Sequence, residues 1–182
     1  MPIAYRITAI DGVELALHRM SGGGGGGGTP VLLAESGAPA GVSWFGDSLL
    51  FASGGRVSVM SSSGGTVTTL RSAGMDTAYS RYYATRGVRW PQLLPGGRQI
   101  LLQVGDSIAV FNRQTGSLTT IAEGDQPLYL PSGHLVFSAG EGRVRVAPFD
   151  LAKLAVTAAP EPVFETFRGP GSGAEYFAVS SS

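Results

Sequence analysis

Turn-forming residues interrupt this chain so often that helices have little room to form. Clusters of glycine, proline and serine recur at short intervals, and glycine alone supplies 28 of the 182 residues. The least unfavourable helical segment, 149–159, lies between two prolines and is better interpreted as a long hairpin loop or one short turn. Short apolar pieces separated by turn signals are typical of all-β proteins. The sequence therefore predicts an all-β fold.

Two segments share the same order of strand, polar turn and returning strand. Residues 107–111 alternate in polarity and precede a polar turn that ends in a glycine, after which 117–121 form the expected returning strand. Residues 56–60 and 66–70 flank a turn rich in serine and glycine in the same way. Glycine supplies the positive φ angle that such tight connections need. The chain therefore contains repeated hairpins.

An aromatic-containing strand, a tight turn and an apolar strand precede each hairpin. If Phe51, Leu102 and Phe137 are equivalent positions of these apolar strands, the repeat intervals are 51 and 35 residues. Propeller blades are repeats of about 40–50 residues, a range that contains the average of the two intervals. The repeats therefore predict propeller blades.

We expect a β-propeller, or a partial propeller, of about four four-stranded antiparallel blades. The N-terminal region supplies three strands, at 3–10, 13–20 and 29–34. Residues 175–179 resemble the first strand of a further blade. That last strand could complete the first blade, because closure is how propellers avoid open edges. A piece of a larger ring and a self-contained or dimerising half-ring both remain open. The predicted division is an incomplete blade at 1–36, blades at 37–73, 74–123 and 124–168, and a last strand within 169–182.

The charge balance argues against a nucleic-acid partner. Basic and acidic side chains number 13 each, and only 14% of the residues are charged, so no strongly basic groove is expected. The absence of cysteine excludes disulfides, thiolate metal sites and cysteine nucleophiles. No stretch approaches the roughly 20 consecutive apolar residues of a membrane helix. Residues 1–10 lack the order of a signal peptide, so we expect a soluble segment without an address of its own.

No arrangement of catalytic or metal-binding residues stands out. The glycine run 22–28 precedes a strand-like segment instead of a helix, which favours an expanded hairpin loop over a phosphate site. The sequence contains no Gly-x-Ser-x-Gly nucleophile elbow, and neither His18 nor His134 has a second histidine at the spacing of a zinc site. A structural role is therefore favoured for both histidines. Five aspartates lie beside glycines or at strand ends, as Asx-turn residues do, and no Asp-x-Asp-x-Asp spacing supports calcium binding: Asp11, Asp47, Asp106, Asp125 and Asp150. Glu35, Glu123 and Glu141 are scattered, and no carboxylate pair is recognisable. We therefore predict no catalytic residue, no metal ligand and no cofactor.

One insertion combines arginines with aromatic residues. Residues 75–88 are the least strand-like stretch and lie between the last strand of one predicted blade and the first strand of the next. Such residues are enriched at protein interfaces and also stack on bases, and the zero net charge favours a protein or peptide partner. An ordered loop with its tyrosines packed on the rim is the competing interpretation. The candidate interaction residues are Tyr79, Arg81, Tyr82, Tyr83, Arg86 and Arg89.

The repeats also resemble a known family. Residues 90–98, Trp-Pro-Gln-Leu-Leu-Pro-Gly-Gly-Arg, resemble the WD40-like (PD40, TolB-type) propeller repeat. Residues 130–137 and 146–150, followed by Pro162 and Val163, are similar to the propeller that follows the membrane segment in many bacterial serine/threonine protein kinases. Gly96 stands where that repeat usually has aspartate. The repeat residues are Trp44, Trp90, Pro95, Gly97, Pro131, Gly133, His134, Pro148, Phe149 and Asp150.

The resemblance implies a noncatalytic module for protein or ligand interaction or sensing, on the extracytoplasmic side of a bacterial membrane. The chain has no kinase motif, so no enzymatic activity is expected of it. Loops on one face, or the central channel, would bind a protein, peptide or small ligand, and self-association could complete a ring. A TolB-type periplasmic scaffold, a propeller hydrolase or lyase, and a gene remnant without function are the alternatives. Packing between blades is expected from Trp44, Phe51, Trp90, Tyr129, Phe137 and Phe149.

Overall fold

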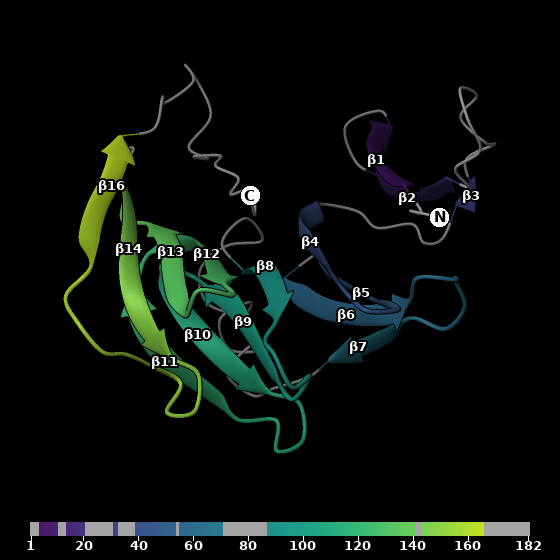
Figure 1. Ribbon diagram of the computed structural model, residues 1–182. Helices are drawn as coiled ribbons and strands as arrows, with labels where there is room; N and C mark the ends of the chain where they lie inside the picture. Colours follow the sequence, from purple (N-terminus) through teal and green to yellow (C-terminus); the bar gives the residue numbers. More distant parts are fainter. Residues whose placement is uncertain are drawn as a thin grey trace.

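The computed structural model describes residues 4–10, 14–20, 31–32, 39–53, 55–70, 87–140 and 143–165. In these ranges every regular element is a β-strand, and the strands form four antiparallel sheets (Figure 1). The prediction of an all-β fold is therefore confirmed. The described ranges contain no helix with the length and apolar character needed to cross a membrane.

Each sheet is built from strands that follow one another in the sequence. The first three sheets are ordered β1-β2-β3, β4-β5-β6-β7 and β11-β10-β9-β8, and the fourth begins β12-β13-β14. The bounds are β1 Ala4–Ile10, β2 Glu14–Met20 and β3 Val31–Leu32; β4 Pro39–Phe45, β5 Ser48–Ser53, β6 Arg56–Ser61 and β7 Thr68–Leu70; β8 Val88–Leu93, β9 Gln99–Val104, β10 Ser107–Asn112 and β11 Leu118–Glu123; β12 Asp125–Leu130, β13 His134–Ser138, β14 Arg143–Asp150, β15 Ala155–Val156 and β16 Glu161–Glu165.

The fourth sheet has five strands instead of the expected four. Its outer edge is divided, because β15 pairs with the end of β14 while β16 pairs with the beginning of the same strand. The turn at 151–154 and the short β15 occupy the segment that the sequence marks as a hairpin loop or single turn. Pro160 lies in the division between β15 and β16, where a residue that cannot donate to a strand ladder is tolerated.

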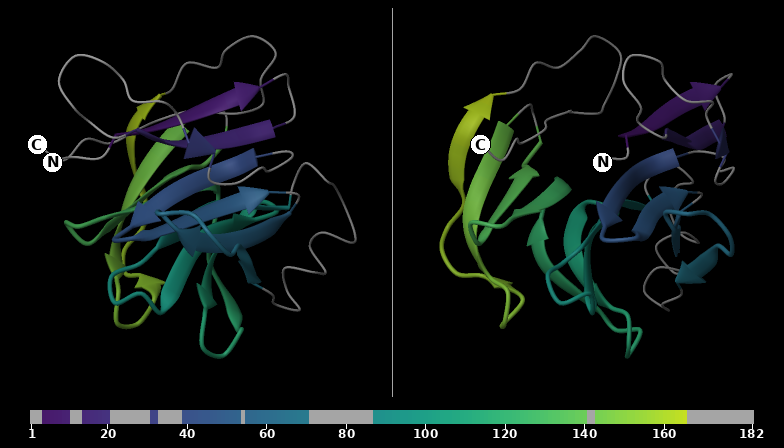
Figure 2. Two further views of the ribbon diagram at one scale, coloured as in Figure 1. Left: turned by 90° about the vertical axis from the view of Figure 1, so that its right-hand side faces the viewer. Right: turned by 45° about the vertical axis from the view of Figure 1, so that its right-hand side comes forward.

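The sheets follow one another around an arc, with the first strand of each sheet on the inner side. Figures 1 and 2 show β4, β8 and β12 toward the inside and β7, β11 and β16 toward the outside. The inner strands contact one another across the sheet boundaries, β4 with β8 and β8 with β12. A radial order of this kind lets each sheet cover the face of the next.

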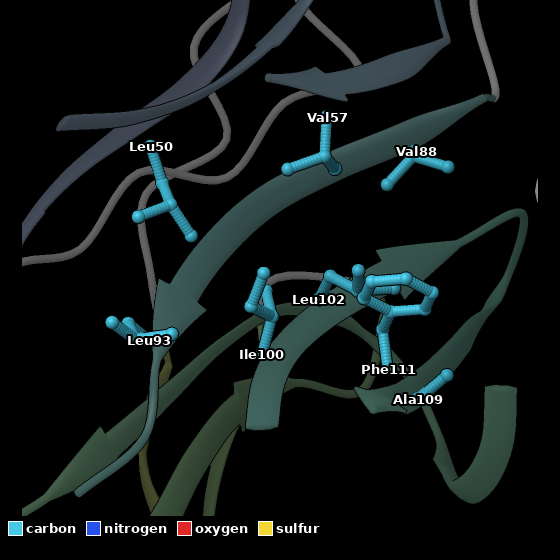
Figure 3. Close-up of a cluster of buried hydrophobic side chains, with 8 residues drawn as sticks. All are labelled: Leu50, Val57, Val88, Leu93, Ile100, Leu102, Ala109 and Phe111. Carbon is cyan, nitrogen blue, oxygen red and sulfur yellow. The ribbon is translucent and has the colours of Figure 1, made fainter. Parts of the chain in front are cut away.

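The third sheet is buried on both faces. On one face, Ile100 and Leu102 join a cluster with Leu50 and Val57 of the second sheet (Figure 3). On the other face, Leu101 packs with residues of the fourth sheet. The members of that second cluster are Leu94, Leu101, Ile108, Val110, Leu135, Phe137, Ala147 and Phe149. Burial on both sides explains why β9 and β10 carry continuous apolar runs instead of alternating polar residues.

Three of the six aromatic residues predicted to pack between sheets do so. Phe137 and Phe149 are buried in the cluster that the third and fourth sheets share, and Tyr129 packs against it. Tyr129 meets Phe149 edge to face, with ring centroids 5.9 Å apart. Phe51 is buried and Trp44 is partly buried, but their cluster, with Leu49 and Met60, lies within the second sheet. Aromatic side chains thus contribute to the contact between the third and fourth sheets.

Trp90 differs from the expected packing. It is half-buried and has a φ angle of 51°, within the bulge of β8 between Arg89 and Gln92. Bulges occupy the same place in β4 and β12. The bulges of β8 and β12 each contain a buried proline, Pro91 or Pro127, which cannot continue the ladder of hydrogen bonds. The Trp-Pro pair therefore marks a bulge as well as an inner strand.

A glutamine side chain joins the inner strands of the third and fourth sheets. Gln92 Nε2 donates to the carbonyl oxygen of Tyr129 at 3.0 Å, and Gln92 Oε1 accepts from the Tyr129 N–H at 2.7 Å. We expect Gln92→Ala to lower the free energy of unfolding by about 2 kcal/mol, because two partly buried backbone groups lose their partner. Chemical denaturation measures this. The matched control, Gln114→Ala, removes an exposed glutamine and should change stability by less than about 0.5 kcal/mol. Equal losses in the two variants would contradict the bridge.

Candidate functional site

One end of the sheets is closed by tight turns that bond to one another. At this tight-turn end of the second, third and fourth sheets, the turn after the first strand accepts a backbone hydrogen bond from the end of the third strand or from the turn that follows it. The bonds run from Ser62 N to Asp47 O, from Arg113 N to Arg98 O and from Phe149 N to Gly133 O, at 2.8, 2.9 and 2.9 Å. Side chains add to this closure, since Arg113 Nη1 donates to Gly97 O at 2.9 Å. These turns are thus tied to one another by backbone hydrogen bonds within each sheet.

Asp150 belongs to the same end and holds the turn that follows β14. Its Oδ1 accepts hydrogen bonds from the backbone N–H groups of Ala152 and Lys153, both at 2.9 Å. The Lys153 ammonium lies 3.3 Å from Oδ2. The backbone hydrogen bond from Lys153, followed by the bond from its side chain, lowers the pKa of Asp150 below the ordinary value of 3.8. The aspartate of the Ala-Pro-Phe-Asp motif therefore stabilises a turn.

The opposite end of the sheets holds a cavity of about 510 Å³. We call it the seam pocket, because it lies where the third sheet leads into the fourth. Its described lining combines three acidic residues and one arginine with apolar residues. The residues that define it are Asp106, Glu123, Asp125, Phe137, Arg145 and Pro160. The volume falls within the range of about 300–1,000 Å³ that is usual for ligand pockets.

The charged residues of the seam pocket come from two connections and one strand. Asp106 lies in the turn between β9 and β10, Glu123 ends β11 and Asp125 begins β12. Arg145 comes from β14, where it pairs with Phe137. Because neighbouring strands are antiparallel, the second turn of each sheet and the link to the next sheet meet at one end. This arrangement brings the charged groups together.

Gly124 allows the link between the third and fourth sheets to run close to β13. Its φ angle is 146°, and its N–H donates to Asp106 O at 3.1 Å. A Cβ atom at this position would lie 2.7 Å from Phe137 Cδ2 and 2.7 Å from Ser138 O. Only glycine fits such an approach without a shift of the backbone. Glu123 and Asp125 therefore flank a backbone position that packs closely against β13.

A buried amide orients one of the three carboxylates. Gln103 is only 4% exposed, and its Nε2 donates to Asp125 Oδ1 and to Gly105 O. Its Oε1 accepts from the Gln126 N–H at 3.3 Å. Arg145 is held by Pro160, whose carbonyl oxygen accepts from Nη1 at 3.3 Å. The wall of the seam pocket is therefore organised by hydrogen bonds from both sheets.

Comparison with solved structures identifies the architecture. TolB from Acinetobacter baumannii, a β-propeller protein, is similar over 80% of this chain, with a TM-score of 0.57 and 14% sequence identity. The fold is that of a partial β-propeller. This chain spans 37% of the TolB chain. The N-terminal domain of Nup159 and Hsv2 of Kluyveromyces lactis also match, both with TM-scores of 0.48, at 11% and 12% identity over 91% and 84% of this chain and 41% and 51% of theirs. No protein-family profile and no curated protein matches the sequence.

The propeller geometry brings together three acidic residues that the sequence does not mark as a group. Asp106, Glu123 and Asp125 lie 17 and 2 positions apart in the sequence, yet all three line the seam pocket between the third and fourth blades. In the ranges that the structure describes, no group of three or more His, Asp or Glu side chains is arranged to hold a metal ion. The signal that could have found the pocket is the up-and-down order of the strands, which assigns all three residues to one end of the propeller.

Of the six predicted interaction residues, the structure describes Arg89. It lies half-buried in β8 and pairs with Gln103. The adjacent Val88 pairs with Val104, beside the turn that carries Asp106, so β8 begins at the end of the propeller that holds the seam pocket. The other predictions that lie outside the described residues are the glycine run 22–28, the last strand 175–179, Asp11, Glu35 and Glu141. The other five predicted interaction residues also lie outside the described residues: Tyr79, Arg81, Tyr82, Tyr83 and Arg86.

His134 forms a short-range contact in a turn of the fourth blade. Its Nδ1 lies 3.1 Å from the hydroxyl oxygen of Ser132, two residues earlier. In the described part of the chain, no carboxylate is hydrogen-bonded to His134, as a Ser-His-Asp arrangement would require. The turn also contains Gly133, whose N–H donates to Leu130 O at 2.9 Å. The geometry agrees with a structural role for this histidine.

Proposed function

We propose that this chain is a noncatalytic propeller module that binds a protein or ligand at the end holding the seam pocket. The single observation that carries the proposal is the seam pocket itself, a cavity of about 510 Å³ that charged and apolar residues line at one end of the sheets. Binding sites are commonly formed by connections that a rigid scaffold holds in place. Here the buried blades supply that scaffold.

A more specific part of the proposal concerns the class of propeller protein to which this chain belongs. The resemblance of residues 130–137 and 146–150 supports a portion of a kinase-associated propeller on the extracytoplasmic side of a bacterial membrane. A TolB-type periplasmic scaffold is the alternative, and the structural likeness to TolB supports it through the fold alone. The upstream gene sequence distinguishes the two: a kinase domain followed by a membrane segment supports the first, and a signal peptide without a kinase supports the second.

The alternative of a propeller hydrolase or lyase needs His, Asp or Glu side chains that converge where first strands begin. Asp125 meets part of this description, since it begins β12 and lines the pocket together with Asp106 and Glu123. The described residues of the pocket lining include no histidine and no serine, which are the residue types of a Ser-His nucleophile and base. A binding role is the better supported proposal.

Photocrosslinking in cells that carry the natural gene tests the proposed function. A photoreactive amino acid would replace Ala139, an exposed residue of the seam pocket, or Thr115, an exposed residue of the tight-turn end. We expect a discrete adduct with a protein or ligand from position 139 and none from position 115. Adducts from position 115 alone, or from neither position, would show that the seam-pocket end is not the binding end.

A further inference from the structure

We draw no further inference here: the strongest candidate, the apolar face of the fourth sheet that carries Leu128, Val136 and Val146 and is turned away from the third sheet, carries no proposal because nothing in the part of the chain that the structure describes shows what covers it.

Discussion

Replacing Gly124 with alanine should lower the free energy of unfolding by about 3 kcal/mol, because two costs add at this position. The φ angle of 146° is one that residues with a Cβ rarely adopt, and the new methyl group would lie 2.7 Å from both the Phe137 ring and Ser138 O. Backbone strain of this kind costs about 1–3 kcal/mol, and overpacking costs a similar amount. Chemical denaturation of the purified protein measures the sum.

A control at a second glycine separates the cost of the backbone φ angle from the cost of the close steric contact. Gly105 has a φ angle of 61°, but a Cβ atom there would meet no atom within 4 Å. Gly105→Ala should therefore cost only about 1 kcal/mol, the price of a left-handed residue with a side chain. If the two variants lost the same stability, close approach of the link to β13 would not be what requires glycine at position 124.

The strands of this propeller could be predicted because each one is bounded by its own turn residues. The strands expected at 107–111 and 56–60 correspond to β10 and β6, and those expected at 3–10 and 13–20 correspond to β1 and β2. Alternation and turn chemistry are local properties, so a single sequence displays them. The bulge at Trp90 was missed because an X-Pro pair is compatible with both an edge strand and a bulge.

The seam pocket could not be predicted in the same way. Asp106, Glu123 and Asp125 each follow a local rule, since each lies in a turn or at the end of a strand. What brings them together is the stacking of the fourth blade on the third, which depends on Leu101, Phe137 and their neighbours. A site formed by blade packing leaves no spacing motif in the sequence, unlike a loop that binds a ligand by itself.

Leu101→Ala and Leu102→Ala should each lower the free energy of unfolding by about 3 kcal/mol, although the two residues are neighbours on one strand. Both side chains are fully buried, but they point to opposite faces of the third blade. Leu101 packs with Leu135 and Ala147 of the fourth blade, whereas Leu102 packs with Leu50 and Val57 of the second. Removing a buried leucine side chain costs about 2–5 kcal/mol through lost burial and the cavity that remains.

Hydrogen exchange should separate the effects of these two substitutions in space. Leu102→Ala is expected to raise amide exchange in β5 and β6, and Leu101→Ala in β13 and β14, because each cavity loosens a different pair of blades. Phe45→Ala is the control, since that side chain is 41% exposed and its removal should cost less than about 1 kcal/mol. In a two-layer sandwich one face of this sheet would meet water. Replacing the leucine on that face with alanine would then lower the free energy of unfolding only slightly. A cost below about 1 kcal/mol for either leucine would therefore contradict a blade that is covered on both sides.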